Sequence, residues 1–456
     1  MSVETIHNQE FYRLHMPPSL KFALLFFATT AIASPPPKAG DLRVATFNIS
    51  FNSDQLSADG SESNPEALTL ALASGEHPNL RKIAAIIQRV NADVILLNEF
   101  DLAYRGAEFD EAATRQRVKG FCVKYLEVTQ PDGATPVVYP HHFVAPTNTG
   151  VHSGHDLNGD GSVKSAHDGS KNDGRAYGGD AFGFGQYPGK YGMVLLSKHP
   201  VLTDQVRTFQ HFRWVDMPGA LLPADPGDIN RDGDRENYYN AAIRAVFRLS
   251  SKSHWDVPLQ VGAEVVHILC SHPTPPSFDD GTTNEHPVKT GKPATKADWN
   301  GLRNHDEIRF WADYLSPERS GYIYDDKEWA AVGNHKPQQP SGGLKLGERF
   351  LILGDQNADP LDGNSTFNPI LQLLNHPLVQ PGAAPASAGA AEQVRLTMQN
   401  RETKTSRFNL RVDYVLPSKS GFVVRPSGVF WPVKSDPSYH LLQASDHRCV
   451  WVDLDL

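Results

Sequence analysis

The sequence of 456 residues contains only three cysteines, Cys122, Cys270 and Cys449, which lie far apart along the chain. Three scattered thiols exclude a disulfide framework and a thiolate zinc cluster, because both need several cysteines at short spacings. Cys270 and Cys449 lie in apolar runs. We therefore expect buried free thiols.

The chain also lacks an excess of basic residues. Lys and Arg together number 43 against 52 Asp and Glu, which gives a formal net charge of -9. A broad surface that holds nucleic acid by neutralising its phosphates needs the opposite balance. The acidic balance does not exclude a small cleft in which a bound cation acts on phosphate. Hydrophobic residues make up 39% of the chain, enough for a large core and too many for a disordered protein.

Long apolar runs are absent except at one place. Residues Phe22 to Ala33 form an apolar stretch that follows Lys21 and ends in the small-x-small sequence Ala31-Ile32-Ala33. This pattern predicts a signal peptide over residues 1–33, cleaved near Ala33, with a linker over 34–40. We therefore expect a secreted or periplasmic protein with no integral membrane segment, and we expect a monomer.

Strand and helix signals interleave along the rest of the chain. Leu80–Val90 and the residues around Trp311 show the apolar spacing of amphipathic helices. Alternation from Ile243 to Leu249 predicts a half-solvated strand. Short apolar runs predict further strands at Leu42–Ile49, Asp93–Leu97, Met193–Leu196, Val265–Cys270, Phe350–Leu353, Val412–Leu416 and Cys449–Leu454. No change in composition divides the chain. We expect one α/β domain over 41–456, with long insertions near 147–189, 216–237 and 279–300.

Polar side chains stand at the ends of six of these strands. Each one alone is typical of a turn, but together they offer carboxylate oxygens, amides and imidazoles. This donor set suits magnesium or manganese and phosphoryl chemistry, and it lacks the thiolates or paired-histidine spacing of a zinc site. The residues are Asn48, Glu99, His272, Asp355 with Asn357, Asp413, and Asp446 with His447.

The motifs around these residues resemble the endonuclease/exonuclease/phosphatase superfamily, which has a deoxyribonuclease-like fold. The resemblance implies a four-layer α/β sandwich, in which two mixed, mostly antiparallel β-sheets pack face to face with helices outside. Pro273, Thr274 and the segment 303–309 further resemble a secreted bacterial branch of that superfamily. The shared motifs are Ala45-Thr46-Phe47-Asn48, Leu97-Asn98-Glu99, Gly354-Asp355-Gln356-Asn357, Arg411-Val412-Asp413-Tyr414 and Ser445-Asp446-His447.

The resemblance implies a metal centre and a water-binding group. Glu99 is similar to the family's principal metal carboxylate, with Asn48 beside it and Asp446 as a second metal contact. Asp355 and Asn357 correspond to residues that contact the attacking water and the phosphate. Gln356 lies between them, and we expect its side chain to point away from both because successive strand residues alternate.

Two histidines complete the implied site. His447 is similar to the family's essential histidine, and Asp413 would hold its other ring nitrogen. His272 matches the histidine near the leaving side of the phosphate. The physical logic is that water attacks phosphorus in line while the charge on the equatorial oxygens is neutralised. A histidine fixed by a carboxylate can supply a hydrogen bond or a charge there.

Two segments share the pattern D-x-N-x-D-G, the opening of a calcium-binding loop. Alternate oxygen ligands and a glycine at the sixth position allow the turn around the ion. The glutamate expected at position twelve is replaced by His167 and by Tyr239. Polar turns without an ion therefore remain the alternative. The candidate ligands are Asp156, Asn158 and Asp160 in the first loop and Asp228, Asn230, Asp232, Asp234 and Glu236 in the second.

The sequence as a whole predicts an exported, divalent-metal-dependent phosphoesterase that hydrolyses a phosphodiester or phosphomonoester by in-line attack of water. One alternative is an extracellular nuclease acting on DNA or RNA, which the charge balance disfavours. Another is a non-catalytic calcium-stabilised binding protein on the same fold, which would require a missing catalytic residue. The substrate stays open between nucleic acid, lipid, sugar and nucleotide phosphates.

Overall fold

The computed structural model describes residues 38–57, 60–131, 135–225, 228, 233–278 and 298–456. These residues belong to one compact unit that begins at Ala33. The predicted signal peptide, most of the linker and the insertion residues 279–297 lie outside the described residues. No described helix combines the length and the apolar character needed to cross a bilayer.

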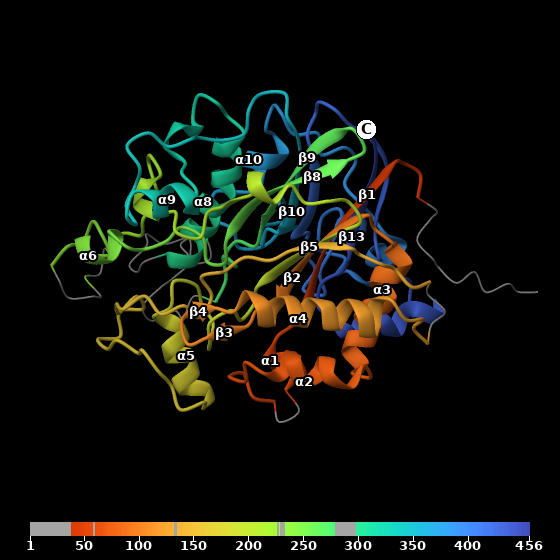
Figure 1. Ribbon diagram of the computed structural model, residues 1–456, viewed down its shortest axis with the longest axis horizontal. Coiled ribbons are helices and arrows are strands. Elements are labelled where there is room, and N and C mark those ends of the chain that lie inside the picture. Colours follow the sequence, from red (N-terminus) through yellow and green to blue (C-terminus); the bar gives the residue numbers. More distant parts are fainter. Residues whose placement is uncertain (1–37, 58–59, 132–134, 226–227, 229–232, 279–297) are drawn as a thin grey trace, which may run out of the picture. The chain divides into compact units, whose positions relative to one another are not determined.

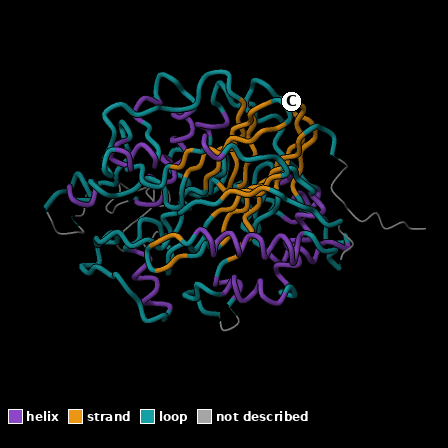
Figure 2. Tube along the Cα trace, in the orientation of Figure 1, coloured by secondary structure: helices purple, strands orange, loops and turns teal. Residues whose placement is uncertain are grey.

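Strands occupy the centre of the molecule, drawn in orange in Figure 2. Seven of the strands expected from the sequence are present with slightly different ends, namely β1, β2, β6, β9, β10, β11 and β13, whereas the other strands were not predicted. The strands are β1 (Leu42–Phe51), β2 (Val94–Phe100), β3 (Tyr104–Arg105), β4 (Glu108–Phe109), β5 (His141–Phe143), β6 (Met193–Ser197), β7 (Arg207–Thr208), β8 (His254–Val261), β9 (Glu264–Ser271), β10 (Arg349–Asp355), β11 (Asp413–Pro417), β12 (Val423–Val429) and β13 (Val450–Asp455).

The strands form two large sheets and one small hairpin. The first sheet has the order β12-β13-β1-β2-β6-β5, and the second has the order β11-β10-β9-β8-β7. Only β1 with β2 and β9 with β10 are parallel, and every other neighbouring pair in these sheets is antiparallel. This arrangement confirms the prediction of two mixed, mostly antiparallel sheets.

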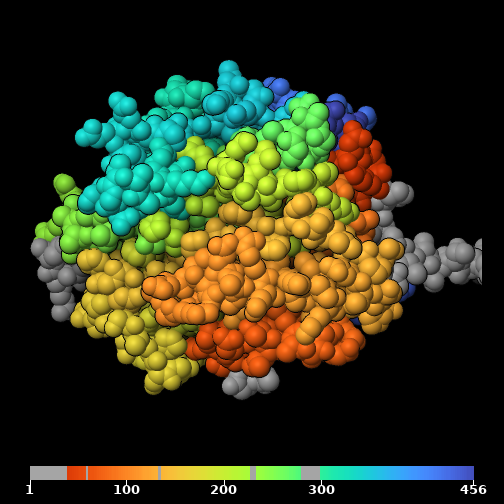
Figure 3. Space-filling view, viewed as in Figure 1, coloured from red at the N-terminus to blue at the C-terminus, as the bar shows by residue number. Residues whose placement is uncertain are grey.

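Helices cover the outer faces of the sheets. In Figure 1, α2 and α4 lie below the strands, whereas α8, α9 and α10 lie above and to the left. The space-filling view shows the same division, with red and orange residues below and cyan residues above (Figure 3). The helices are α1 (Ser53–Leu56), α2 (Ala67–Ser74), α3 (Pro78–Val90), α4 (Glu111–Phe121), α5 (Lys171–Gly179), α6 (Ala241–Arg244), α8 (Trp299–Tyr314), α9 (Asp326–Ala331), α10 (Leu371–Leu374) and α11 (Ala388–Gln393).

Neighbouring residues of the second sheet pack into two different cores. Ile268 and Cys270 of β9 pack into a cluster that also contains the strands of the first sheet. Leu269, between them, packs with Ile308 and Trp311 of α8. Because successive side chains of a strand point to opposite faces, the second sheet is buried on both sides. The layers are therefore helix, sheet, sheet and helix, as the sequence predicted. All three cysteines are free and buried, which confirms that expectation.

The strand predicted from Ile243 to Leu249 is wrong. Residues Ala241–Arg244 form the short helix α6, and the Asn240 side chain caps it by accepting a hydrogen bond from the Ile243 amide at 3.0 Å. Ile243 and Phe247 are both buried. Residues four apart share a face of a helix as well as a face of a strand, so alternation alone did not separate the two.

The insertion predicted near 147–189 is not wholly a surface segment. Thr147, Asn148 and Thr149 at its start are completely buried. The Asn148 side-chain amide donates hydrogen bonds to the carbonyls of Gln210 at 2.9 Å and Ser250 at 2.7 Å. The beginning of the segment is therefore part of the packed domain, because its polar groups satisfy the backbone of two other loops.

Candidate active site

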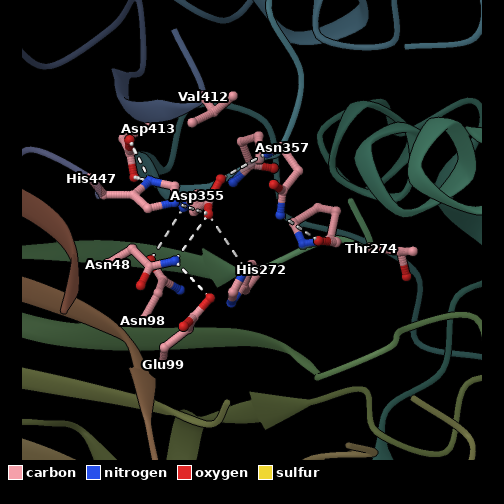
Figure 4. Close-up of polar contacts among 12 residues, drawn as sticks. Asn48, Asn98, Glu99, His272, Thr274, Asp355, Asn357, Val412, Asp413 and His447 are labelled. Carbon is pink, nitrogen blue, oxygen red and sulfur yellow. Dashed lines mark hydrogen bonds and ion pairs between the residues drawn. The ribbon is translucent and has the colours of Figure 1, made fainter. Parts of the chain in front are cut away.

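The polar residues of the two packed sheets come together where the parallel strand pairs end. Asn48 and Glu99 lie near the ends of β1 and β2, while His272 and Asp355 lie at the ends of β9 and β10. Parallel strands end at the same edge of a sheet, so each pair brings its polar residues together. The Asn48 amide joins the two sheets, since its Nδ2 donates to Glu99 Oε1 at 3.0 Å and to Asp355 Oδ2 at 3.1 Å (Figure 4).

Asp355 is the centre of the polar cluster (Figure 4). Its Oδ2 lies 3.4 Å from His272 Nε2 and 3.5 Å from His447 Nε2, in addition to the Asn48 contact. Burial opposes ionisation of this carboxyl, but the charge of His447 and the hydrogen bond from His272 hold its pKa well below the usual range. Asp355 is therefore an acceptor held between two imidazoles.

Asp413 fixes the ring of His447. His447 Nδ1 lies 3.0 Å from Asp413 Oδ2 and 3.2 Å from Oδ1, and the Thr405 hydroxyl donates to Oδ2 at 2.7 Å. Burial alone would lower the pKa of His447, but the carboxylates of Asp413 and Asp355 raise it well above its usual value. Burial raises the pKa of Asp413 to about 6. The ring is held in one orientation, with Nε2 directed at Asp355.

Glu99 lies in an environment that disfavours its negative charge. Asn48 donates to one carboxylate oxygen and Asn52 to the other, both at 3.0 Å. The backbone of Glu99 has a φ of 60°, a strained value for a residue with a side chain. Burial, together with the negative charge of Asp446, raises the pKa of Glu99 to about 7. Asp446 is partly buried in the turn before β13.

These carboxylates fit a hard divalent cation. Glu99 and Asp446 could supply oxygen ligands, and a cation between them would relieve the repulsion that, together with burial, raises the pKa of Glu99. A second group of possible ligand atoms, from Asp355, Asp413 and His447, lies within 4.8 Å of one another. In that group the His447 and Asp413 side chains already bind each other, so the expectation that Glu99 and Asp446 hold the cation stays a prediction.

Asn357 completes the predicted set at the rim of the cluster. Its backbone has a φ of 53°, and its amide N–H donates to Asp355 Oδ1 at 2.9 Å. Its side-chain Nδ2 donates to the Pro273 carbonyl at 3.0 Å. The side chain of Gln356 points away from this site, as expected, because its Nε2 donates to the Ser271 hydroxyl at 3.0 Å, which also contacts Trp311 of α8.

Helix α8 holds the active-site loops from behind. Asn304 Nδ2 donates to the carbonyl of Thr274 at 2.8 Å and to that of Gln356 at 3.1 Å. Thr274 lies in the loop after β9, and Gln356 lies in the loop after β10. The Glu307 carboxylate accepts the amides of Ser251 and Thr274, both at 2.6 Å. Neither residue had a predicted role, and only the resemblance of segment 303–309 drew attention to them. No sequence pattern indicated that Asn52 or Thr405 would contact the site, because both look like ordinary loop residues.

The first candidate calcium loop is folded by its own side chains. Asp156 Oδ1 accepts the Gly159 amide and Oδ2 accepts the Gly161 amide, both at 2.8 Å, while Asn158 Oδ1 accepts the Asp160 amide at 3.1 Å. Calcium binding at this loop stays a prediction.

The second candidate loop is described only in part. Asn230 and Asp232 lie outside the described residues. Asp228 accepts the Gly233 amide at 2.9 Å, and Asp234 accepts the amides of Glu236 at 2.9 Å and Asn237 at 3.1 Å. Asp234 and Glu236 were predicted to help close this loop around an ion, and that prediction stays open.

The comparison with known proteins identifies the family to which this chain belongs. The family model described as Endonuclease/Exonuclease/phosphatase family matches residues 45–447, so the chain belongs to that family. No curated protein matches the chain significantly.

Several solved structures are similar over most of the chain. An endonuclease/exonuclease/phosphatase from Beutenbergia cavernae is 17% identical, with a TM-score of 0.41, over 91% of this chain and 71% of that one. Sphingomyelinase C from Streptomyces griseocarneus is 15% identical, with a TM-score of 0.39, over 90% and 98%. A family protein from Leptotrichia buccalis is 10% identical, with a TM-score of 0.41, over 91% and 100%.

Proposed function

We propose that this protein is an exported, divalent-metal-dependent phosphoesterase that hydrolyses a phosphodiester or phosphomonoester by in-line attack of water. The observation that carries the proposal is the position of Asp355, whose Oδ2 lies within 3.5 Å of both His272 Nε2 and His447 Nε2. Membership of the family supports phosphate-ester chemistry. The export of the protein rests on the apolar run that ends at Ala33.

The metal-binding residues and Asp355 have different roles in the proposed reaction. A magnesium or manganese ion held by Glu99, Asn48 and Asp446 would neutralise charge on the phosphoryl group. Asp355 stays ionised at neutral pH, so it can accept a hydrogen bond from the attacking water and then its proton.

The histidines have different tasks. Charged His447 donates a hydrogen bond from Nε2 toward the reacting group, which stabilises the negative charge that develops there. Burial, with the charge of Lys252, lowers the pKa of His272 to about 4, so this ring is neutral at pH 7. Neutral His272 donates from Nε2 to Asp355, and this bond orients the carboxylate for the water.

A nuclease is the less favoured form of the activity. The basic side chains of the segment 147–189 already form ion pairs: Lys164 lies 2.5 Å from Asp173, Lys171 lies 2.6 Å from Glu62, and Arg175 lies 3.3 Å from Glu62. Paired charges contribute little to phosphate binding. A non-catalytic protein is disfavoured because every predicted catalytic side chain is present.

A substrate panel tests the proposal. Bis-nitrophenyl phosphate, nitrophenyl phosphate, plasmid DNA, RNA, sphingomyelin, phosphatidylinositols and nucleotides would each be incubated with magnesium, manganese, calcium or a chelator. We expect hydrolysis of at least one phosphodiester or phosphomonoester with magnesium or manganese and none with chelator. Full activity after exhaustive chelation would contradict the metal-dependent mechanism.

A further inference from the structure

Three lysines are buried in the described part of the chain, and one of them differs from the other two. Lys190, Lys252 and Lys404 are 0%, 6% and 1% exposed. The Lys190 ammonium donates to Asp54, Gln186 and the Glu62 carbonyl at 2.6 to 2.9 Å.

The second buried lysine is also paired. The Lys404 ammonium lies 2.8 Å from Asp359 and 2.6 Å from Asp362. The ammonium of Lys252 has no hydrogen bond or ion pair with any described residue. The side chain is buried, but Nζ is not among the fully buried polar atoms that lack a partner, so the ammonium tip reaches solvent and can meet a ligand there. A charge in such a largely buried place is costly unless something pairs with it.

Lys252 lies at the active-site edge of the second sheet. His254 at the start of β8 pairs with Ser271 at the end of β9, so Lys252, two residues earlier, lies beyond the end of β9 with His272. Glu307 joins the two loops, because its carboxylate accepts the amides of Ser251 and Thr274 at 2.6 Å.

The backbone of Lys252 is fixed on both sides. Glu307 holds the preceding amide, and the Lys252 carbonyl accepts the Asn148 amide at 2.8 Å. The main chain is therefore rigid while the side chain keeps three unused donors. This combination is a preorganised cation rather than a mobile surface lysine.

The surroundings of Lys252 contain both charge and unused polar groups. Its positive charge lowers the pKa of Glu99 and of His272, which places it within electrostatic reach of both sides of the site. The Nδ1 atom of His272 is buried and has no hydrogen-bond partner among the described residues. The hydroxyls of Ser251 and Thr274, on the two residues that Glu307 joins, are buried without partners as well.

We propose that Lys252 binds a non-bridging oxygen of the substrate phosphate, as a cationic binding residue of the active site beside His272. The inference rests on the proposed phosphoesterase function and adds the phosphate-binding group to it. A phosphate oxygen supplies the negative charge and the acceptor lone pairs that this ammonium lacks. The ammonium is available for that role, because none of the described carboxylates near it is hydrogen-bonded to Lys252.

Inorganic phosphate is the probe for this site, with its affinity measured by calorimetry on the purified full chain. We expect Lys252→Met to weaken phosphate binding roughly tenfold or more, the size of a lost charge-assisted hydrogen bond, and Lys252→Arg to recover part of it. Lys190→Met is the matched control. It removes an equally buried but fully paired ammonium, so we expect a lower melting temperature with unchanged phosphate affinity.

The outcomes separate this inference from the proposed function. Phosphate affinity is measured without turnover, so it reports on Lys252 even if no tested substrate is hydrolysed. Unchanged phosphate affinity in folded Lys252→Met, or in Lys252→Gln if the Met variant does not fold, overturns the inference. Failure of the unmodified protein to bind phosphate also overturns it. If the protein hydrolyses a substrate, Lys252→Met should in addition raise KM.

Discussion

Two acidic regions of this molecule hold their charge in different ways. In the active site, Asp355 and Asp413 are each 1% exposed, and charged His447 lies between their carboxylates. In the loop 156–161, Asp156 is only partly buried and Asp160 is exposed. Their oxygens accept backbone amides of the same loop and of Ser162, which follows it. Both regions look like metal sites in the sequence.

The difference shows what the two arrangements require. Burying a carboxylate costs free energy unless specific partners offset it, and those partners come from strands far apart in the chain. A loop that binds its own amides needs only its local sequence, so the same pattern serves equally well as a turn. Charges that are buried and paired across the fold therefore carry more information about function than exposed charges in a motif.

The largest expected effect is at His447. Replacing it by alanine removes the charged donor facing Asp355, so we expect His447→Ala to lower turnover by roughly two to four orders of magnitude. Asp413→Asn should lower turnover less, because the imidazole remains but its orientation and charge are no longer favoured. The measurement is steady-state kinetics on whichever substrate the panel identifies.

The double variant sharpens this prediction. If Asp413 acts through His447, the loss in the double variant is smaller than the product of the two single losses. A simple product would mean that the residues act independently. Near-normal turnover of folded His447→Ala would mean that the active site lies elsewhere.

Much of the site was predictable, because its residues follow apolar strands whose ends meet. Asn48, Glu99 and Asp355 each close a run that reads as a strand, and pairing brings them together. The sequence could not predict the residues of α8 that hold the loops around the site in place. Asn304 and Glu307 lie on a helix whose other face is apolar, and their partners are backbone groups of distant loops.

The fold was predictable for a similar reason, and its errors have a common cause. Alternation of apolar residues identifies a strand only when the same spacing does not also fit a helix. Ile243 and Phe247 lie four residues apart, which fits both, so the strand prediction was wrong there. Strand β8 carries polar residues, among them His254 and Asp256, that are buried by pairing with other buried groups. Such a strand does not read as an apolar run.

The next effect in size concerns Glu307. In Glu307→Gln the side chain keeps one acceptor oxygen and turns an NH₂ group toward a second amide donor. We expect kcat to fall roughly tenfold, the size of a lost hydrogen bond to a charged group, because the loops of Lys252 and His272 lose their common anchor. Glu348→Gln is the control, since Glu348 accepts a single amide, that of Lys345, at an exposed position.

Two readouts separate positioning from general destabilisation. The fall in kcat should appear at temperatures far below the melting transition. Magnesium affinity should be unchanged, because Glu307 is not one of the proposed metal-binding residues. Equal kcat in Glu307→Gln and Glu348→Gln would show that the anchor does not position the site.

The pH dependence of stability tests the metal assignment. The pKa of Glu99 is raised from its ordinary value of 4.5 to about 7 in the folded chain. Between these values the folded protein binds the proton and the unfolded chain does not, so the metal-free protein loses stability as pH rises through this window. Magnesium binds the ionised form, so it should raise the melting temperature by a few degrees at pH 8 and hardly at all at pH 5.

The variant Glu99→Gln should reduce this dependence. Glutamine does not ionise, so the metal-free variant should lose less stability between pH 5 and 8 than the unmodified protein; the loss that remains comes from other buried carboxyls such as Asp413, whose pKa is raised to about 6. The magnesium increment should be lost. A magnesium increment that is equal at both pH values in the unmodified protein would contradict the assignment of the cation to Glu99.

The smallest effect is expected at the loop 156–161. Asp156→Ala removes the acceptor of the Gly159 and Gly161 amides in a largely solvated place, so we expect a stability loss of about 1 kcal/mol and no change in turnover. If the loop binds calcium, millimolar calcium raises the melting temperature of the unmodified protein, and Asp156→Ala loses that increment while Asp228→Ala tests the second loop in the same way. Differential scanning calorimetry with calcium or chelator makes the measurement. An increment that survives both substitutions places the ion elsewhere, and no increment at all makes both segments turns, because their oxygens are then fully used by the backbone.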